Sequence, residues 1–219
     1  MVDKSKEILF KDVKILLLPQ KVVFLPDHNI MILADWHLGK ATHFRKEGIY
    51  MPYAGTVKEL DKLKLLIINY KPETIVFLGD LFHSHINSEW DIFTSFIKYY
   101  PDIRFILTIG NHDILPVATF ENAGLEVVPY LIIGETIICT HIPMDIVPEN
   151  RINMAGHVHP GCSIDFLGRQ QFRLPCFYYY DQRLLLPAFG ELTGFTSMQQ
   201  LTGAKIYPVL DNEVVEWIS

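Results

Sequence analysis

The stretch RFILTIGNHDIL (residues 104–115) joins an apolar run to the small and polar residues Gly-Asn-His-Asp. Continuous apolarity, as in RFILTI, is typical of a strand buried on both faces in a layered α/β protein. GNHD alone has two interpretations. Gly and Asn tolerate positive φ, and Asn, His and Asp bond to nearby backbone, so an ordinary turn is one interpretation. The other is a group of metal-binding side chains placed where a strand ends.

Four other runs have the same character, and each ends in Asp or His. They are NIMILAD (29–35), TIVFLGD (74–80), TIICTH (136–141) and INMAGH (152–157). Apolar residues recur at helical spacing in 57–67 and again in 87–100, which gives strand–helix–strand units and favours parallel neighbours. After about residue 125 the pattern changes to short strands, EVVPYLII, TIICT, FRL, CFYYY and KIYPVL, joined by Pro and Gly turns. We therefore predict an α/β fold with two packed mixed β-sheets, a β-sandwich, and helices outside.

Composition limits the class of protein. The 219 residues, 49% hydrophobic and 20% charged, suit one domain (1–219) with a substantial core. The net charge of −6 argues against wide, non-specific phosphate binding, although a local basic patch or a metal can still bind nucleic acid. No apolar run is long enough to span a membrane, and the first residues make a poor signal peptide. Three widely spaced cysteines indicate buried thiols, so a cytoplasmic location without membrane contact is expected.

The polar residues at the strand ends form a candidate metal site. The candidate ligands are Asp35, His37, Asp80, Asn111, His141, His157 and His159. Carboxyl ends of strands line the ligand crevice in open α/β sheets, so these turns should face one spot. In Asp-x-His and His-x-His, an extended backbone would put both side chains on one face. Taken singly, each residue also fits a helix cap, a strand histidine or a core histidine.

The ligand types indicate the kind of metal and the chemistry. Carboxylate, imidazole and amide oxygen without thiolate suit Mn²⁺, Fe²⁺, Co²⁺ or Zn²⁺. The seven candidates exceed the needs of one tetrahedral ion but suit two ions that share a carboxylate. Such a pair clamps a phosphate for in-line displacement, with a bridging hydroxide as the nucleophile. The ordered occurrence of all five motifs makes coincidence the weaker explanation.

The order D-x-H, GD, GNHD, H, GHxH over residues 35–159 resembles that of the calcineurin-like metallophosphoesterases. The resemblance implies a four-layer architecture, a β-sandwich flanked by helices, and two divalent ions, for which we expect Mn²⁺. It also implies a role for each matching residue: Asp35, His37 and His159 hold one ion, Asn111, His141 and His157 hold the other, Asp80 bridges them, His112 is the catalytic acid, and Asp113 orients its imidazole.

A narrower resemblance involves DWHLGKATHFRKEGIYMP, FLGDLFHS and LLLPAFGELTGF, which are similar to the PdeM subfamily of ligase-associated DNA damage response endonucleases or phosphodiesterases. It implies a nucleic acid or nucleotide substrate, with a DNA ligase and a helicase as partners in DNA repair. The chain departs from the subfamily pattern at Trp36, where Leu is usual, and in THIP around His141. The glycines of LPAFGELTGF could bring a loop near the metals or simply form a strand turn.

Candidate substrate contacts follow the first two ligand motifs. They are Lys40, His43, Arg45 and His83, and Lys46 lies beside them. A solvated helix face and a polar loop are the alternative interpretations. Tyr178, Tyr179 and Tyr180 could stack bases, but in a β-rich region alternating core and surface tyrosines are the favoured interpretation.

The expected function is that of a metal-dependent phosphodiesterase or nuclease acting on DNA or nucleotide phosphodiesters. One alternative is a small-molecule nucleotide pyrophosphatase or phosphomonoesterase, which the acidic net charge favours slightly. The other is a non-catalytic interaction scaffold of the same fold, against which the complete ligand set and His112 argue.

Overall fold

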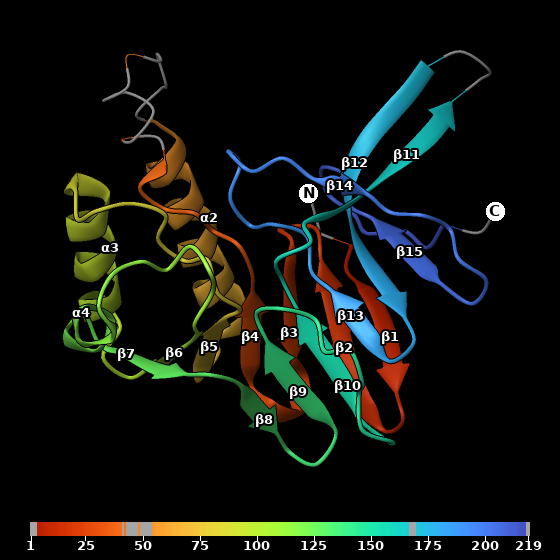
Figure 1. Ribbon diagram of the computed structural model, residues 1–219, viewed down its shortest axis with the longest axis horizontal. Coiled ribbons are helices and arrows are strands. Elements are labelled where there is room, and N and C mark those ends of the chain that lie inside the picture. Colours follow the sequence, from red (N-terminus) through yellow and green to blue (C-terminus); the bar gives the residue numbers. More distant parts are fainter. Residues whose placement is uncertain (1–3, 41, 43–47, 49–53, 167–169, 218–219) are drawn as a thin grey trace.

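The computed structural model describes residues 4–40, 42, 48, 54–166 and 170–217, and it contains two β-sheets packed face to face (Figure 1). The first sheet has the order β1-β2-β3-β4-β5-β6-β7. Its strands are β1 (Lys6–Phe10), β2 (Val13–Leu18), β3 (Val22–Leu25), β4 (Ile30–Leu33), β5 (Thr74–Phe77), β6 (Arg104–Thr108) and β7 (Leu125–Val128). β1 to β4 pair antiparallel, whereas β4 to β7 pair parallel.

Helices connect the parallel strands, as the sequence predicted. They are α2 (Ala54–Tyr70), α3 (Ser88–Tyr99) and α4 (Val117–Asn122), and a short 3-10 helix, η1 (Pro26–His28), precedes β4. α3 begins at a predicted cap, where the Asn87 side chain accepts a hydrogen bond from the backbone N–H of Glu89. That bond satisfies one of the donors that every helix start leaves open. α4 was not predicted, because six residues give too little periodicity to recognise.

The second sheet has the order β14-β11-β12-β13-β10-β9-β8, and β15 pairs with β12. Its strands are β8 (Leu131–Ile133), β9 (Ile137–Thr140), β10 (Ile152–Ala155), β11 (Pro160–Phe166), β12 (Gln170–Tyr180), β13 (Arg183–Leu185), β14 (Thr196–Ser197) and β15 (Lys205–Pro208). FRL and CFYYY, predicted as separate strands, are both part of β12, which runs through Pro175. Pro175 lies opposite Gly161, and its carbonyl accepts from the Val209 N–H at 2.9 Å, so the missing N–H does not end the strand.

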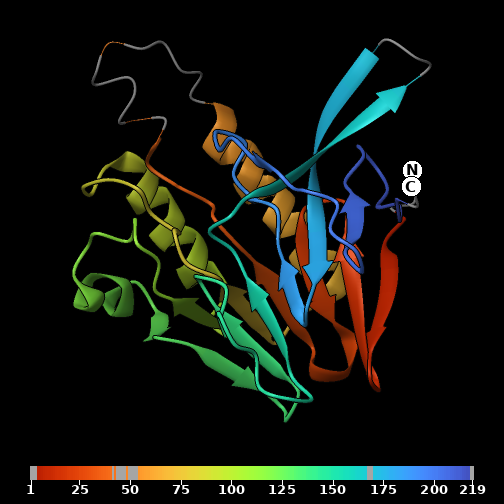
Figure 2. The same ribbon diagram turned by 45° about the vertical axis from the view of Figure 1, so that its right-hand side comes forward.

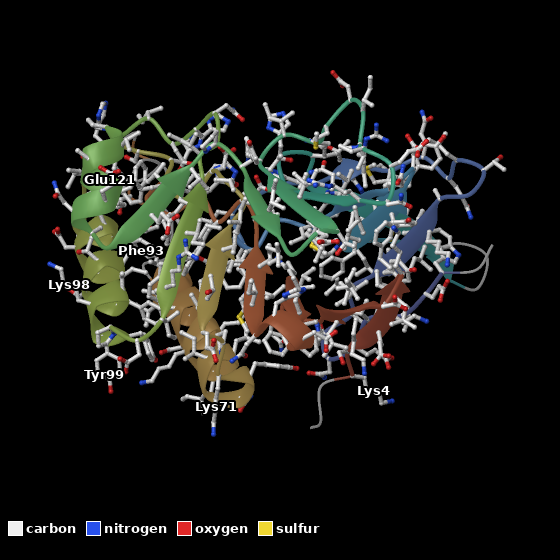
Figure 3. All side chains as sticks on the ribbon, turned by 90° about the horizontal axis from the view of Figure 1, so that it is seen from below. Lys4, Lys71, Phe93, Lys98, Tyr99 and Glu121 are labelled. Atoms are coloured by element: carbon white, nitrogen blue, oxygen red, sulfur yellow. The ribbon has the colours of Figure 1, made fainter. Side chains whose placement is uncertain are left out.

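Two apolar layers hold these elements together. One lies between the sheets and includes Ile32 and Val76 from the first sheet and Met154 and Phe177 from the second. The other lies between the first sheet and helices α2, α3 and α4, and Phe93 of α3 is buried in it (Figure 3). The outer face of the second sheet carries a smaller apolar cluster, against which Trp217 packs.

The predicted sandwich of two mixed sheets with helices outside is therefore confirmed. Within the described residues the α-helices cover only the first sheet, so the layers are helix, sheet and sheet, where the resemblance implied four. The cysteines Cys139, Cys162 and Cys176 are buried and free, as expected. Among the described residues no helix is both long enough and apolar enough to cross a membrane.

Candidate metal centre

The candidate ligands lie at the carboxyl ends of five strands that belong to both sheets. β4, β5 and β6 are adjacent and parallel in the first sheet, and β9 and β10 are adjacent and parallel in the second. Because the sheets face each other, all five ends meet at one edge of the sandwich. The β11–β12 hairpin leaves from this edge and projects beyond the two sheets (Figures 1 and 2).

Two groups of ligand atoms converge there, each with its atoms within 4.8 Å of one another. In the first, His159 Nε2 lies 3.3 Å from Asp35 Oδ1 and 3.4 Å from His37 Nε2. In the second, which also contains Asp80, His141 Nε2 lies 3.2 Å from His157 Nδ1. Asn111 Oδ1 adds an amide oxygen 2.9 Å from the same His141 nitrogen.

Asp80 connects the two groups. Its Oδ2 lies 3.7 Å from His37 Nε2, and its Oδ1 lies 3.4 Å from His141 Nε2. Neutral imidazole nitrogens that point into one small space repel each other unless a cation lies among them. Imidazole, carboxylate and amide donors are those that Mn²⁺, Fe²⁺, Co²⁺ and Zn²⁺ accept, so the residues present fit a pair of divalent ions with Asp80 between them.

The protonation state of His37 and the tautomer of His141 suit ligation. Burial, together with His159 and other nearby cationic groups, lowers the pKa of His37 to about 2, so its imidazole is neutral. The Nδ1–H of His141 donates to the Leu78 carbonyl at 2.9 Å, which leaves its Nε2 free to bind a metal. Burial opposes charge on His159, but its hydrogen bonds to Asp35 and to the Gly194 backbone outweigh that effect and raise its pKa.

The backbone that presents the ligands is left-handed, not extended. φ is +53° at Asp35 and His37, +49° at Asp80, +66° at His157 and +50° at His159. The prediction that an extended backbone aligns Asp-x-His and His-x-His is thus wrong, although the side chains do converge. Hydrogen bonds from backbone N–H groups to the ligand carboxylates hold two of these left-handed turns. Asp35 accepts from His157 N at 2.9 Å, and Asp80 accepts from His112 N at 2.8 Å.

The glycines of the motifs allow the turns to approach one another. A Cβ on Gly79 would lie 2.3 Å from Nδ1 of His141, and one on Gly156 would lie 2.6 Å from Oδ2 of Asp35. Carbon atoms do not tolerate such distances from a neighbouring side chain. The Gly in GD and in GHVH is therefore required by the close packing of the ligands themselves.

His112 and Asp113 occupy different environments. The half-buried His112 ring lies beside the centre, with its centroid 4.1 Å from that of His83 and 5.6 Å from that of His37. The buried Asp113 carboxylate accepts from the backbone N–H groups of Leu81, Phe82 and Gly110 at 2.8, 3.0 and 2.8 Å. Burial raises the pKa of Asp113 to about 6. The resemblance implied that Asp113 orients the His112 imidazole. In the structure the Asp113 carboxylate joins the turn after β5 to the turn after β6, and so positions His112 through the backbone.

The predicted substrate contacts are only partly placed. His83 lies at the centre, with its Nδ1 3.2 Å from Nδ1 of His37. The Lys40 backbone N–H donates to the His37 carbonyl at 3.4 Å, so the Lys40 backbone lies next to the first ligand group. His43, Arg45 and Lys46 lie outside the described residues. Tyr178 is buried and donates its hydroxyl to the Gln199 carbonyl at 3.0 Å, which supports a core role.

Sequence reasoning left open the role of the segment after β13, and the structure places this segment behind the first ligand group. Phe189 N donates to the Ala34 carbonyl at 2.8 Å, directly before the ligand Asp35. The buried Glu59 accepts from Trp36 Nε1 at 2.8 Å and from Glu191 N at 2.7 Å, which joins α2, the Asp-x-His turn and this segment. The glycines of LPAFGELTGF were the sequence signal for this approach.

The fold and the two ligand groups define a metal-dependent phosphoesterase. A profile of the calcineurin-like phosphoesterases matches residues 28–171, and the chain belongs to this family. The chain is similar to the crystal structure of Pseudomonas putida nuclease MPE, with 26% identity, a TM-score of 0.82, and coverage of 98% of this chain and 100% of that one. It also matches Yfce, a phosphoesterase from E. coli, at 10% identity and a TM-score of 0.47, over 85% of this chain and 96% of that one. No curated protein sequence matches the chain.

Proposed function

We propose that the protein is a phosphodiesterase that cleaves nucleic acid. The observation that carries the proposal is the pair of ligand groups joined by Asp80, with the His112 imidazole beside them. The similarity to the P. putida nuclease extends over nearly the whole chain, which supports nucleic acid as the substrate. Asp35, His37 and His159 would hold one ion, Asn111, His141 and His157 the other, and Asp80 both, with Mn²⁺ the proposed metal and Fe²⁺, Co²⁺ and Zn²⁺ the alternatives.

Each residue has a definite task in this proposal. The two ions, when bound, supply an activated water and neutralise charge at phosphorus. His112 donates a hydrogen bond to a phosphoryl oxygen and a proton to the departing oxygen. Its position is fixed because its backbone N–H is bonded to Asp80 and its turn is held by Asp113. His83 stands against the His112 ring and closes one side of the substrate space.

A small-molecule pyrophosphatase or phosphomonoesterase is the second candidate, favoured by the net charge of −6. A scaffold without catalysis is disfavoured because both ligand groups and His112 are in place. The DNA ligase and the helicase named by the subfamily resemblance remain predicted partners.

The deciding experiment compares bis-p-nitrophenyl phosphate with p-nitrophenyl phosphate after chelation and readdition of Mn²⁺. We expect Mn²⁺-dependent diester hydrolysis that falls about 10²–10⁴-fold in His112→Ala, the usual contribution of a general acid. Mn²⁺ binding should be retained, because His112 is outside both ligand groups. His28→Ala is the matched control, since His28 lies in η1 before β4, at the opposite end of that strand from the site.

Hydrolysis of the monoester alone would favour the small-molecule phosphatase. Absence of turnover with Mn²⁺ bound, or full activity in His112→Ala, would overturn the proposal.

A further inference from the structure

The ligand His159 is tied to a short segment that carries Phe195. Thr196 N donates to the His159 carbonyl at 2.8 Å, and β14 pairs parallel with the first residues of β11. The His159 imidazole hydrogen bonds to the backbone of Gly194. Phe195, which lies between Gly194 and Thr196, is therefore fixed beside a ligand of the first group.

Phe195 and Arg173 form a stacked pair on the hairpin. A Cβ on Gly161 would lie 2.2 Å from Cδ2 of Phe195, so the glycine leaves the space that the ring occupies. The guanidinium carbon of Arg173, on β12, lies 5.2 Å from the centroid of the Phe195 ring, within the range of a cation–π contact. Phe195 is half-buried and Arg173 is exposed, so the guanidinium is open to a ligand on its far side.

The pair lies on the side of the hairpin that faces the first sheet. Alternate residues of a strand share a face, so Arg173, Pro175 and Phe177 point to the same side of β12. Phe177 is buried between the two sheets, which identifies this side as the one that faces the first sheet. The hairpin projects beyond the sandwich (Figure 2), and Phe195 on this side of it lies between Gly194 and Thr196, whose backbones bond to the ligand His159.

A guanidinium above an aromatic ring suits one kind of ligand. Nucleobases stack on arginine planes and on aromatic rings, and the positive charge also attracts the adjoining phosphate. In a duplex the base faces are already covered by neighbouring bases. Only an unpaired nucleotide can offer a face to Arg173 while its phosphate enters the metal centre.

We infer that Arg173 and Phe195 form a subsite that stacks one base of a single-stranded nucleic acid next to the scissile phosphate. The inference rests on the proposed phosphodiesterase function. It specifies that the substrate is single-stranded. It also gives two residues that are not metal ligands a role in substrate specificity. Neither residue is required for hydrolysis of a diester that has no base.

The test compares a fluorescent single-stranded DNA oligonucleotide, its duplex and bis-p-nitrophenyl phosphate, all with Mn²⁺. Wild type should cleave the single strand in preference to the duplex. Arg173→Gln and Phe195→Leu should each lower kcat/KM on the single strand by about tenfold, mainly through KM, because stacking contributes to binding. Hydrolysis of the small diester should stay within about twofold of wild type.

Phe172→Leu is the matched control, because Phe172 is an exposed aromatic on the same strand, 51% accessible, and points to the opposite face. It should leave all three substrates unaffected. If Phe195→Leu does not fold, Arg173→Gln decides alone, since its side chain is exposed.

Several results would overturn the inference. An equal loss on DNA and on the small diester would make the pair a support for the metal centre only. Unchanged cleavage of the single strand by both variants would show that no base stacks there. If the wild-type protein hydrolyses the small diester but prefers duplex DNA, the inferred subsite is wrong and the phosphodiesterase proposal stays intact. If the wild-type protein does not hydrolyse the small diester at all, the proposed function on which the subsite rests is wrong instead.

Discussion

Five of the seven candidate ligands have left-handed backbones, which cost a non-glycine residue about 1–2 kcal/mol each. The turns keep this conformation because their neighbours fix it, through the bonds from His157 N to Asp35 and from His112 N to Asp80. Ligand atoms are thereby preorganised by the protein, and each carboxylate both faces the metal position and holds a neighbouring turn.

Substitution Gly156→Ala tests this crowding at a single residue. The added Cβ would meet Asp35 Oδ2 at 2.6 Å and the Ala34 Cβ at 2.9 Å, so the Asp35 carboxylate must move. We expect at least a tenfold loss of Mn²⁺ affinity and a fall in the free energy of unfolding of about 1–3 kcal/mol, the usual cost of overpacking. Calorimetric titration with Mn²⁺ and urea unfolding measure the two quantities.

Gly194→Ala is the control, because a Cβ there meets nothing within 4 Å. Both quantities should stay near wild type. Equal behaviour of the two variants would contradict the crowding argument.

At the scale of elements, Glu89 of α3 joins the chain after the first ligand turn to the start of α2. Its buried carboxylate accepts from Gly39 N at 2.9 Å, from Thr42 N at 2.9 Å and from the Thr56 hydroxyl at 2.8 Å. Gly39 follows His37 closely, so this carboxylate also supports the backbone of the first ligand group.

Glu89→Ala should lower the free energy of unfolding by about 3 kcal/mol, because it leaves buried N–H and O–H donors without their acceptor. Urea unfolding with Mn²⁺ present measures it. Glu126→Ala removes an exposed partner of Arg104 and should cost less than about 1 kcal/mol. A cost for Glu89→Ala as small as that of Glu126→Ala would show that the carboxylate does not hold these elements.

Elements whose signals are local could be predicted from the sequence. The runs before Asp35, Asp80 and Asn111 are buried on both faces, and their composition shows it. The conformation of the turns could not be predicted, because left-handed φ at His37 or His159 depends on contacts with other turns. The bond from Glu191 N to Glu59 joins residues 132 positions apart, and no periodicity predicts such a pair. The sequence predicts a strand end at Pro175, because the partners that tolerate it, Gly161 and Val209, lie elsewhere in the chain.

At the scale of the whole molecule, the candidate centre spans both sheets. Asp80 and Asn111 come from the first sheet, whereas His141 and His157 come from the second, and all four would bind one ion. Bound metal would therefore join the two halves of the sandwich at one edge.

Metal removal should lower the thermal stability of the whole chain. At a free concentration of about 100 times its Kd, an ion that binds only the folded state adds about 2.7 kcal/mol to the free energy of unfolding. For a chain of this size that corresponds to a rise in Tm of about 5–10 °C on adding Mn²⁺ to chelated protein. Differential scanning calorimetry measures it.

The rise should be strongly reduced in Asp80→Ala, which lacks the carboxylate between the two groups, and unchanged in Asp91→Ala, whose side chain is exposed on α3. An equal rise in all three proteins would place the bound Mn²⁺ elsewhere.

The left-handed ligand turns also affect how this chain can evolve. Glycine, and to a lesser degree asparagine, fits such a backbone with less strain than aspartate or histidine. Mutations that remove a ligand can therefore stabilise the fold while they abolish activity, a familiar conflict between stability and function. In a library selected only for heat resistance in the presence of a chelator, His37 and His159 should be among the first positions to drift. Lineages that retain histidine there would be those in which catalysis, not folding, is under selection.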